Sequence, residues 1–269
     1  MLIHRSPQAV LGPVLVALAL LATGCGSGSS PSSSESPSRR QTLVFVDYSI
    51  STGGHPQAES LYVDSLARIV DRRLRHPGDR LSLYYVHEKT LSKAHRLDVR
   101  NEVPPLKDRE FPDEQALARA RHKRKTEQFL HRTTRRLQTA LQSPPPSPSV
   151  SEWTDLWGTV GVATTELSSR ADTHTVYYFS DMYESMPGAG RRNFDRRPPQ
   201  SRAQAERWAR ADVPRLDSLM RVETTRLRNV RVRVLLGTLA TKPRAQAVKF
   251  YWRTFFQELG VPPRQIDYN

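Results

Sequence analysis

Short apolar runs alternate with longer amphipathic stretches along most of the chain. Four runs, 42–46, 81–86, 175–179 and 230–236, have the length and the β-branched or aromatic content of buried strands. A shorter, more polar run near 97–99 predicts an edge strand. Between the runs, apolar residues recur every three or four positions, which predicts helices over 57–74, 113–141, 154–170, 204–227 and 243–259.

Proline and glycine residues lie where these elements are expected to end. Pro77 and Gly78 end the first helix, and the proline-rich segment 143–149 ends the second. Pro214 is a weak point within the fourth helix. The second helix is expected to turn one apolar face inward: Leu117, Phe129, Leu130, Leu137 and Leu141.

Strands that alternate with helices favour one fold class. They predict an α/β, three-layer, doubly wound and mostly parallel sheet, with helices on both faces and right-handed crossovers. We expect one folded domain over residues 41–269. The length of 269 residues is sufficient for a large core.

The first 40 residues differ in composition from the rest. Residues 1–24 hold Arg5 and then an apolar stretch that is too short for a typical membrane span, as in a secretory signal peptide. The segment ending at Cys25, the only cysteine of the chain, resembles a bacterial lipobox, which implies lipidation of Cys25. A plain cleaved signal peptide is the alternative. Residues 25–40 are rich in Ser, Pro and Gly, which predicts a flexible tether.

The net charge of +14 favours anionic partners such as lipid headgroups, acidic polymers or an acidic protein. Solvated basic helix faces are an equally simple explanation. Nucleic acid is not expected, because the sequence has neither a zinc-binding spacing nor an aromatic RNA-binding signature.

Polar oxygens follow two of the predicted strands. Asp47, Ser49 and Ser51 come directly after the first run in the spacing Asp-x-Ser-x-Ser, and Asp181 follows the third long run. Thr154 begins a later helix. Carboxylate and hydroxyl oxygens are the ligands that Mg²⁺ prefers. Since ligands of open α/β sheets bind beyond the carboxyl ends of the strands, we expect these side chains to share one crevice.

This set resembles the metal-ion-dependent adhesion site of von Willebrand factor type A and integrin I domains, over roughly residues 42–259. The resemblance implies a bound Mg²⁺, or Mn²⁺ or Ca²⁺. It implies that Ser49, Ser51 and Thr154 contact the cation directly, while Asp47 and Asp181 help directly or through water. In the family a glycine often follows the last Asp, where this chain has Met182.

The resemblance also implies the kind of partner, because in this family the cation bridges to an acidic group. Arg191, Arg192, Arg196 and Arg197 follow Asp181 along the chain. A positive rim beside a cation would favour an acidic protein or an anionic envelope polymer. A loop with incidental charge is the simpler explanation.

Simpler explanations exist for the metal-site residues too. Asp47 and Thr154 have the chemistry of helix caps, and Asp181 that of a polar strand end. A metal-dependent phosphohydrolase with Asp47 as nucleophile and a metal-free envelope scaffold stay open as alternatives. For the enzyme, no obvious general acid follows Asp47. We predict a membrane-tethered, exported binding module of the cell envelope, and not an enzyme.

Overall fold

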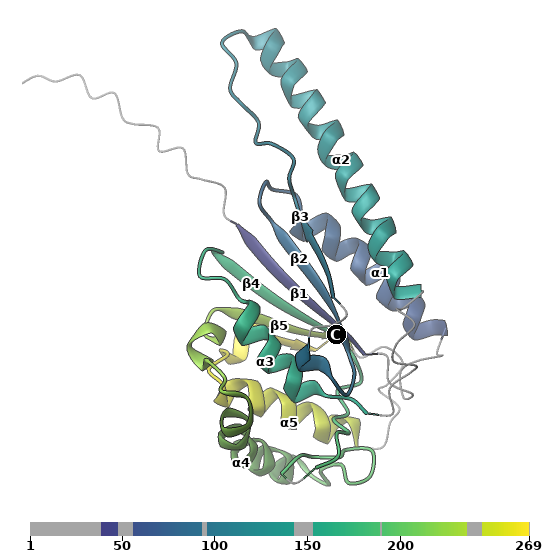
Figure 1. Ribbon diagram of the computed structural model, residues 1–269, viewed down its shortest axis with the longest axis vertical. Helices are drawn as coiled ribbons and strands as arrows, with labels where there is room; N and C mark the ends of the chain where they lie inside the picture. Colours follow the sequence, from purple (N-terminus) through teal and green to yellow (C-terminus); the bar gives the residue numbers. More distant parts are fainter. Residues whose placement is uncertain are drawn as a thin grey trace, which may run out of the picture. The chain divides into compact units, whose positions relative to one another are not determined.

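A sheet of six strands lies at the centre of the part of the chain that the computed structural model describes, residues 39–47, 56–92, 96–142, 153–188, 190–235 and 244–268. The strands are β1 (Arg40–Asp47), β2 (Arg80–Val86), β3 (Arg96–Arg100), β4 (Thr173–Phe179), β5 (Val230–Leu235) and β6 (Ile266–Tyr268). Their order is β3-β2-β1-β4-β5-β6 (Figure 1), and β3 alone runs antiparallel to its neighbour. All belong to one compact unit that spans Ser36–Asn269.

Helices cover both faces of this sheet. They are α1 (Pro56–Arg73), α2 (Pro112–Gln142), α3 (Leu156–Glu166), α4 (Arg202–Met220) and α5 (Ala245–Glu258), with short 3₁₀ turns η1 (Thr90–Ser92), η2 (Thr224–Leu227) and η4 (Pro263–Gln265). Helices α1 and α2 lie on one face, and α3, α4 and α5 lie on the other (Figure 1).

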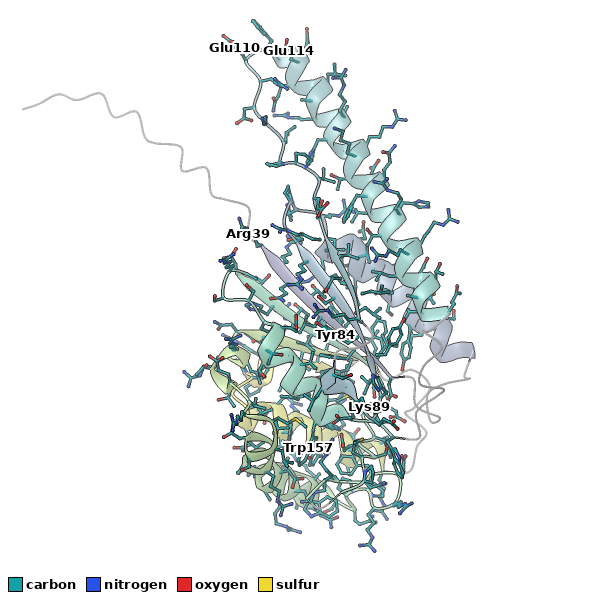
Figure 2. All side chains as sticks on the ribbon, viewed as in Figure 1. Arg39, Tyr84, Lys89, Glu110, Glu114 and Trp157 are labelled. Atoms are coloured by element: carbon teal, nitrogen blue, oxygen red, sulfur yellow. The ribbon has the colours of Figure 1, made fainter. Side chains whose placement is uncertain are left out.

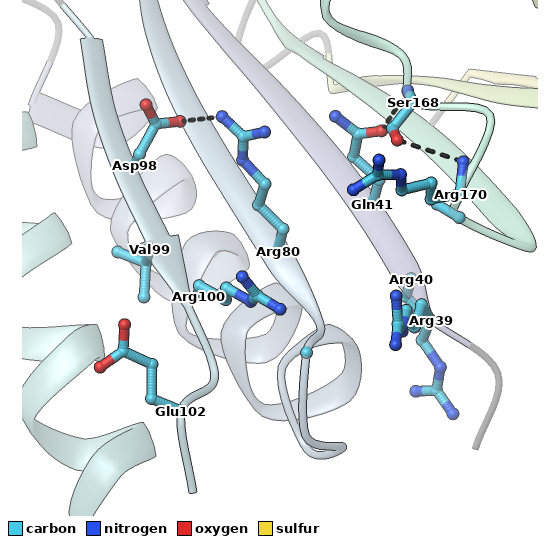
Figure 3. A pocket seen from close by; sticks show the side chains of 12 residues that line it. Arg39, Arg40, Gln41, Arg80, Asp98, Val99, Arg100, Glu102, Ser168 and Arg170 are labelled. Carbon is cyan, nitrogen blue, oxygen red and sulfur yellow. Dashed lines mark hydrogen bonds and ion pairs between the residues drawn. The ribbon is translucent and has the colours of Figure 1, made fainter. Parts of the chain in front are cut away.

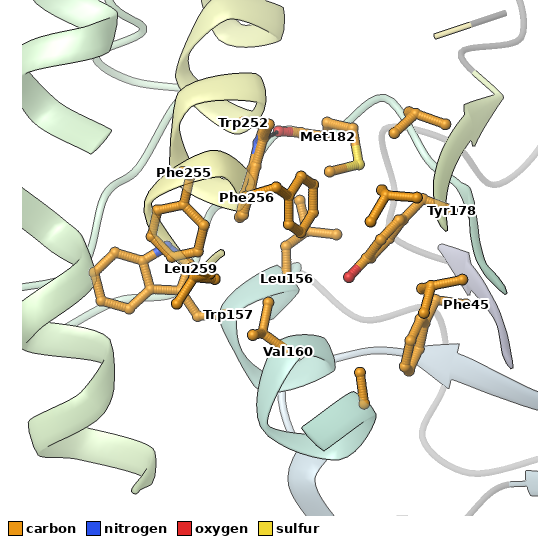
Figure 4. Close-up of a cluster of buried hydrophobic side chains, with 14 of the residues drawn as sticks. Phe45, Leu156, Trp157, Val160, Tyr178, Met182, Trp252, Phe255, Phe256 and Leu259 are labelled. Carbon is orange, nitrogen blue, oxygen red and sulfur yellow. Dashed lines mark hydrogen bonds between the residues drawn. The ribbon is translucent and has the colours of Figure 1, made fainter. Parts of the chain in front are cut away.

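The alternation of side chains along β1 explains the two layers. Leu43 and Phe45 pack into the core beneath α3, α4 and α5, whereas Val44 and Val46 pack into the core beneath α1 and α2. All four side chains are at most 1% exposed. Figure 4 shows the aromatic part of the first core, where Trp157 stacks on Phe255 with ring centroids 5.8 Å apart. The predicted α/β fold class, with helices on both faces of a mostly parallel sheet, is confirmed.

The strand order reverses between β1 and β4. The chain passes from β1 through α1 to β2 on one side of β1, and later returns to β4 on its other side. The parallel register pairs Val46 with Phe179, so these two strands end side by side. We call this end, marked by Asp47 and Phe179, the carboxyl edge. The opposite end, where β1 and β2 begin at Arg40 and Arg80, is the amino edge.

Several elements differ in length from the prediction. Helix α3 ends at Glu166, four residues early, because Leu167 is extended. Helix α4 ends at Met220, where Arg221 adopts a left-handed conformation with φ of 50°, and it continues through Pro214. The parallel strand β6 was not predicted, since three residues carry too little periodicity. Arg40 already belongs to β1, one residue before the expected domain start.

Helix α2 extends beyond the sheet (Figure 1). Its buried residues are Thr126, Leu130, Thr133, Leu137 and Leu141, so none lies before Thr126. The expectation that Leu117 faces inward is wrong, since its side chain is 51% exposed. We use "the arm" for the extended segment 102–111 and the helical residues 112–125 that project together. None of the described helices combines the length and the apolar composition needed to cross a membrane.

Candidate metal site at the carboxyl edge

The carboxyl edge brings two predicted site residues together. Asp47 is the last residue of β1, Asp181 follows β4 by two residues, and both are 3% exposed. The Ser180 hydroxyl lies between the two strand ends and donates to Asp47 Oδ2 at 2.8 Å. Two buried carboxylates from segments 134 positions apart therefore belong to one polar cluster at the point of strand reversal.

A tight turn follows β4. The Ser180 hydroxyl accepts from the Met182 N–H and Asp181 Oδ1 accepts from the Tyr183 N–H, each at 2.9 Å. Met182 has φ of 62°, the left-handed conformation that favours glycine. Such a conformation costs a non-glycine residue about 1–2 kcal/mol. Burial of the Met182 side chain and the 2.6 Å bond from Trp252 Nε1 to its carbonyl help to offset that cost.

Tyr62 of α1 lies near both carboxylates. Burial and the negative charges of Asp47 and Asp181 raise the pKa of its phenol. The ring stacks on Phe179 with centroids 4.9 Å apart, and the hydroxyl has no hydrogen-bond partner among the described residues. Sequence reasoning missed Tyr62, because its helical spacing with Leu66 and Ile69 is that of a core residue.

Thr154 lies on the loop before α3 and is 1% exposed. Its N–H donates to Ser185 Oγ at 2.7 Å, and its carbonyl accepts from the Ser185 N–H at 3.1 Å. Ser185 comes four residues after Asp181, so this loop is joined to the segment that follows β4. The helix-cap explanation of Thr154 is wrong, since Asp155 caps α3 by accepting from the Gly158 N–H at 2.7 Å.

The remaining predicted ligands, Ser49 and Ser51, lie outside the described residues, as does Cys25. Among the described residues, no three His, Cys, Asp or Glu side chains form a group able to hold a metal ion. A cation at the Asp47 and Asp181 carboxylates therefore requires further oxygens, such as hydroxyls. Two buried carboxylates beside a partnerless Tyr62 hydroxyl fit a hard cation, which binds oxygen donors of this kind.

Arg191 belongs to a buried ion-pair cluster. Its guanidinium donates to Asp155 Oδ1 at 2.6 Å and contacts Glu184 Oε1, and its side chain is 11% exposed. Glu184 is fully buried and also accepts from the N–H groups of Leu156 and Trp157 at 2.8 and 3.2 Å. Burial raises the pKa of Glu184 to about 8, against the opposing effect of the Arg191 charge.

Arg192 is also paired with a buried acid. It forms two bonds to the fully buried Asp212 of α4, at 2.6 and 2.8 Å, and stacks over Trp208. Arg191 and Arg192 thus have a structural role, because carboxylates that the sequence analysis did not single out neutralise them. Of the four arginines predicted to form a ligand rim, Arg196 and Arg197 are exposed. The rim hypothesis therefore depends on these two.

Comparison with known proteins gives structural similarities only. No protein-family model matches the chain, and no curated protein matches it. An aerotolerance-related membrane protein from Bacteroides fragilis is 10% identical with a TM-score of 0.39, over 85% of this chain and 90% of that one. Proximal thread matrix protein 1 from the mussel byssus is also 10% identical, with a TM-score of 0.39, over 86% of this chain and 44% of that one.

A third similar structure is the manganese-loaded TRAP protein of Plasmodium vivax, at 12% identity and a TM-score of 0.36, over 86% of this chain and 68% of that one. Identities this low concern the fold alone. We assign the fold from the strand order and from the helices on both faces of the sheet. Both features agree with what the resemblance to von Willebrand factor type A domains implies.

Proposed function

We propose that the chain is a binding module that holds an acidic partner through a divalent cation at the carboxyl edge. The proposed ligands are Asp47, Ser49, Ser51, Thr154 and Asp181, and the proposed cation is Mg²⁺, or Mn²⁺ or Ca²⁺. One observation carries the proposal. Asp47 and Asp181 are both buried at the ends of adjacent parallel strands and belong to one cluster through Ser180.

The chemistry of the donors favours an anionic partner. A bound cation would supply a positive centre for a carboxylate of the partner. The five proposed protein ligands leave one position of an octahedral Mg²⁺ open, which a carboxylate of the partner can fill. The exposed Arg196 and Arg197 provide positive charge on the loop that follows Asp181, which speeds the arrival of an acidic protein or an anionic polymer.

The proposed location is the cell envelope, on the exported side of a membrane. The support is the sequence of residues 1–24, which has the features of a secretory signal, and the lipobox-like segment that ends at Cys25. In this proposal residues 26–38 tether the folded unit, whose first strand begins at Arg40, to a lipid on Cys25.

Titration with Mg²⁺, followed by thermal unfolding, tests the cation site. At 100 times the dissociation constant the wild type should gain about 2.7 kcal/mol, roughly 5–10 °C in Tm for a unit of this size. Asp181→Asn and the double variant Ser49→Ala/Ser51→Ala should lose the gain. Asp172→Asn is the matched control, since it makes the same charge change at the amino edge.

Two outcomes decide against the cation site. A wild type that gains no stability favours a metal-free scaffold, and so does an equal gain in Asp181→Asn. Turnover of a phosphate ester that disappears in Asp47→Asn would favour a phosphohydrolase instead.

Immobilised polyglutamate is a suitable probe for the acidic partner. Retention of the wild type should require Mg²⁺ and should fall to the level of Asp181→Asn when a chelator is added. Retention that is equal with and without chelator would mean that the positive net charge alone attracts the probe.

A further inference from the structure

Arginine side chains gather around an open pocket of about 440 Å³ at the amino edge, opposite the candidate metal site. They come from separate segments of the chain: Arg39 and Arg40 at the start of β1, Arg80 at the start of β2, Arg100 at the end of β3, and Arg170 on the loop after α3. The acids of the lining are Asp98 and Glu102. Figure 3 shows these side chains around the pocket.

Two of the arginines have partners. Arg80 contacts Asp98 at 3.3 Å and Glu166 at 3.9 Å, and Arg40 donates to the Arg72 carbonyl at 2.7 Å. These contacts fix the wall of the pocket. The loop opposite is fixed as well, because the Gln41 side chain bonds the Glu166 carbonyl and the Ser168 N–H at 2.7 and 2.8 Å.

The other three arginines, Arg39, Arg100 and Arg170, are exposed, and none of their guanidinium groups forms an ion pair with another described residue. Asp98 is already shared by Arg80 and Arg96, so Glu102 is the acid left to oppose them. Guanidinium forks match phosphate oxygens in geometry and charge. The pocket therefore offers three unpaired phosphate-binding groups on a rigid frame.

The arm starts beside this pocket. Asn101 is held at the amino edge by hydrogen bonds with the backbone of Gly78 and Asp79, each at 2.8 Å, and its side chain bonds the Leu74 carbonyl. Residues 115–136 of α2 then carry eight Lys or Arg and one Glu. On this stretch Lys123 and Glu127 form an exposed ion pair at 3.9 Å. This helical stretch is therefore also strongly basic.

We propose that the amino edge docks on a membrane, with the arginine pocket taking the phosphate of an anionic phospholipid headgroup. The tip of the arm carries the carboxylates Glu110 and Glu114 (Figure 2), which an anionic bilayer repels, so the arm is not part of the proposed membrane contact. Each basic side chain near an anionic bilayer adds about fivefold in affinity.

The point at which the chain enters β1 is the reason for proposing a membrane as the occupant of the arginine pocket. Residue 39 enters β1 at this same edge, and its N–H bonds Asp172 Oδ2 at 2.8 Å. This step rests on the proposed lipidation of Cys25. A Ser-, Pro- and Gly-rich tether over residues 26–38 would span about 20 Å on average. The amino edge would then stay near the bilayer at a high effective concentration of headgroups.

Vesicle co-sedimentation of the full chain with Cys25→Ser, which cannot be acylated, tests the proposal. Vesicles hold 30% phosphatidylglycerol in phosphatidylcholine, or phosphatidylcholine alone to measure the contribution of the apolar segment 9–22. The Arg39→Ala/Arg100→Ala/Arg170→Ala variant should bind the anionic vesicles on the order of 100-fold more weakly. Arg207→Ala/Arg210→Ala/Arg253→Ala is the control, with the same charge change at exposed arginines of α4 and α5 that do not line the pocket.

The outcomes separate this proposal from the cation site, because every measurement is made in chelator. Loss of binding in the pocket variant alone supports the proposal. Equal loss in both triple variants means that net charge is sufficient and overturns the pocket. A wild type that binds soluble polyphosphate but not the anionic vesicles overturns the membrane as occupant. Circular dichroism of each variant verifies that the fold is retained.

Discussion

At the scale of single residues, arginines near the carboxyl edge form ion pairs with buried acids. Arg191 is shared by Asp155 and Glu184, so this buried cluster holds one more carboxylate than cation. Asp155 also caps α3. Glu184 is fully buried, so its charged form loses its hydration, and the negative charge of Asp155 disfavours that form further. This is the physical reason for the raised pKa of Glu184.

The raised pKa predicts a pH dependence. Between the ordinary value of 4.5 and the folded value of about 8, the folded state holds a proton on Glu184 that the unfolded state has lost. The contribution of this group to stability is thus complete below pH 4.5 and is lost as the pH rises through 8. Urea unfolding at pH 5 and pH 8 should show this fall in the wild type and not in Glu184→Gln. Parallel pH profiles would contradict it.

At the scale of elements, α2 combines two unlike halves. Its second half packs on α1 through Leu130, Leu137 and Leu141, and the Tyr85 hydroxyl bonds the Ala140 carbonyl at 2.8 Å. Its first 14 residues, 112–125, have no buried side chain. That half is stabilised by local effects, such as the helix-forming residues of the sequence and Asp113 and Glu114 in the first turn, which complement the helix dipole.

The two halves should respond differently to the same substitution. Leu137→Ala removes a fully buried side chain and should lower the free energy of unfolding by about 2–5 kcal/mol. Leu117→Ala changes a half-exposed side chain on the arm and should stay within about 0.5 kcal/mol. Denaturant unfolding measures both. A large loss in Leu117→Ala would mean that the arm packs against the rest of the unit in solution.

At the scale of the whole molecule, the two proposed sites occupy opposite edges of one sheet. Strand β1 has 8 residues, which places its ends about 25 Å apart. This distance exceeds the Debye length of about 8 Å at physiological ionic strength. One edge can therefore face a membrane while the other faces a partner, with little electrostatic coupling between them.

This separation predicts independent behaviour. Asp181→Asn should abolish stabilisation by Mg²⁺ and leave binding to anionic vesicles within about twofold of the wild type. The triple arginine variant of the pocket should do the reverse. Thermal unfolding gives the stabilisation by Mg²⁺, and vesicle co-sedimentation gives the affinity for anionic vesicles. Each is measured on both variants. A change in vesicle binding caused by Asp181→Asn would show that the edges are coupled.

The sequence by itself determined the elements and their alternation. The periods of two and 3.6 are local properties, so β1, β2, β4, β5 and the five helices could be predicted within about four residues, except that α4 ends at Met220 and not near 227. The ends of the buried strands could be predicted as well. In a parallel sheet these ends lie at one edge, so Asp47 and Asp181 were expected to lie at the same edge. Ser180 and Tyr62 carried no local signal that distinguishes them from ordinary strand-end and core residues.

Only the tertiary structure decided which distant groups meet. The pairing of Arg191 with Asp155 and of Arg192 with Asp212 joins residues 36 and 20 positions apart. The exposure of Leu117 depends on where the sheet ends, and the arginine pocket depends on four segments that converge at the amino edge. Periodicity reports the face on which a side chain lies. Chain topology and the size of the neighbouring elements determine what that face contacts.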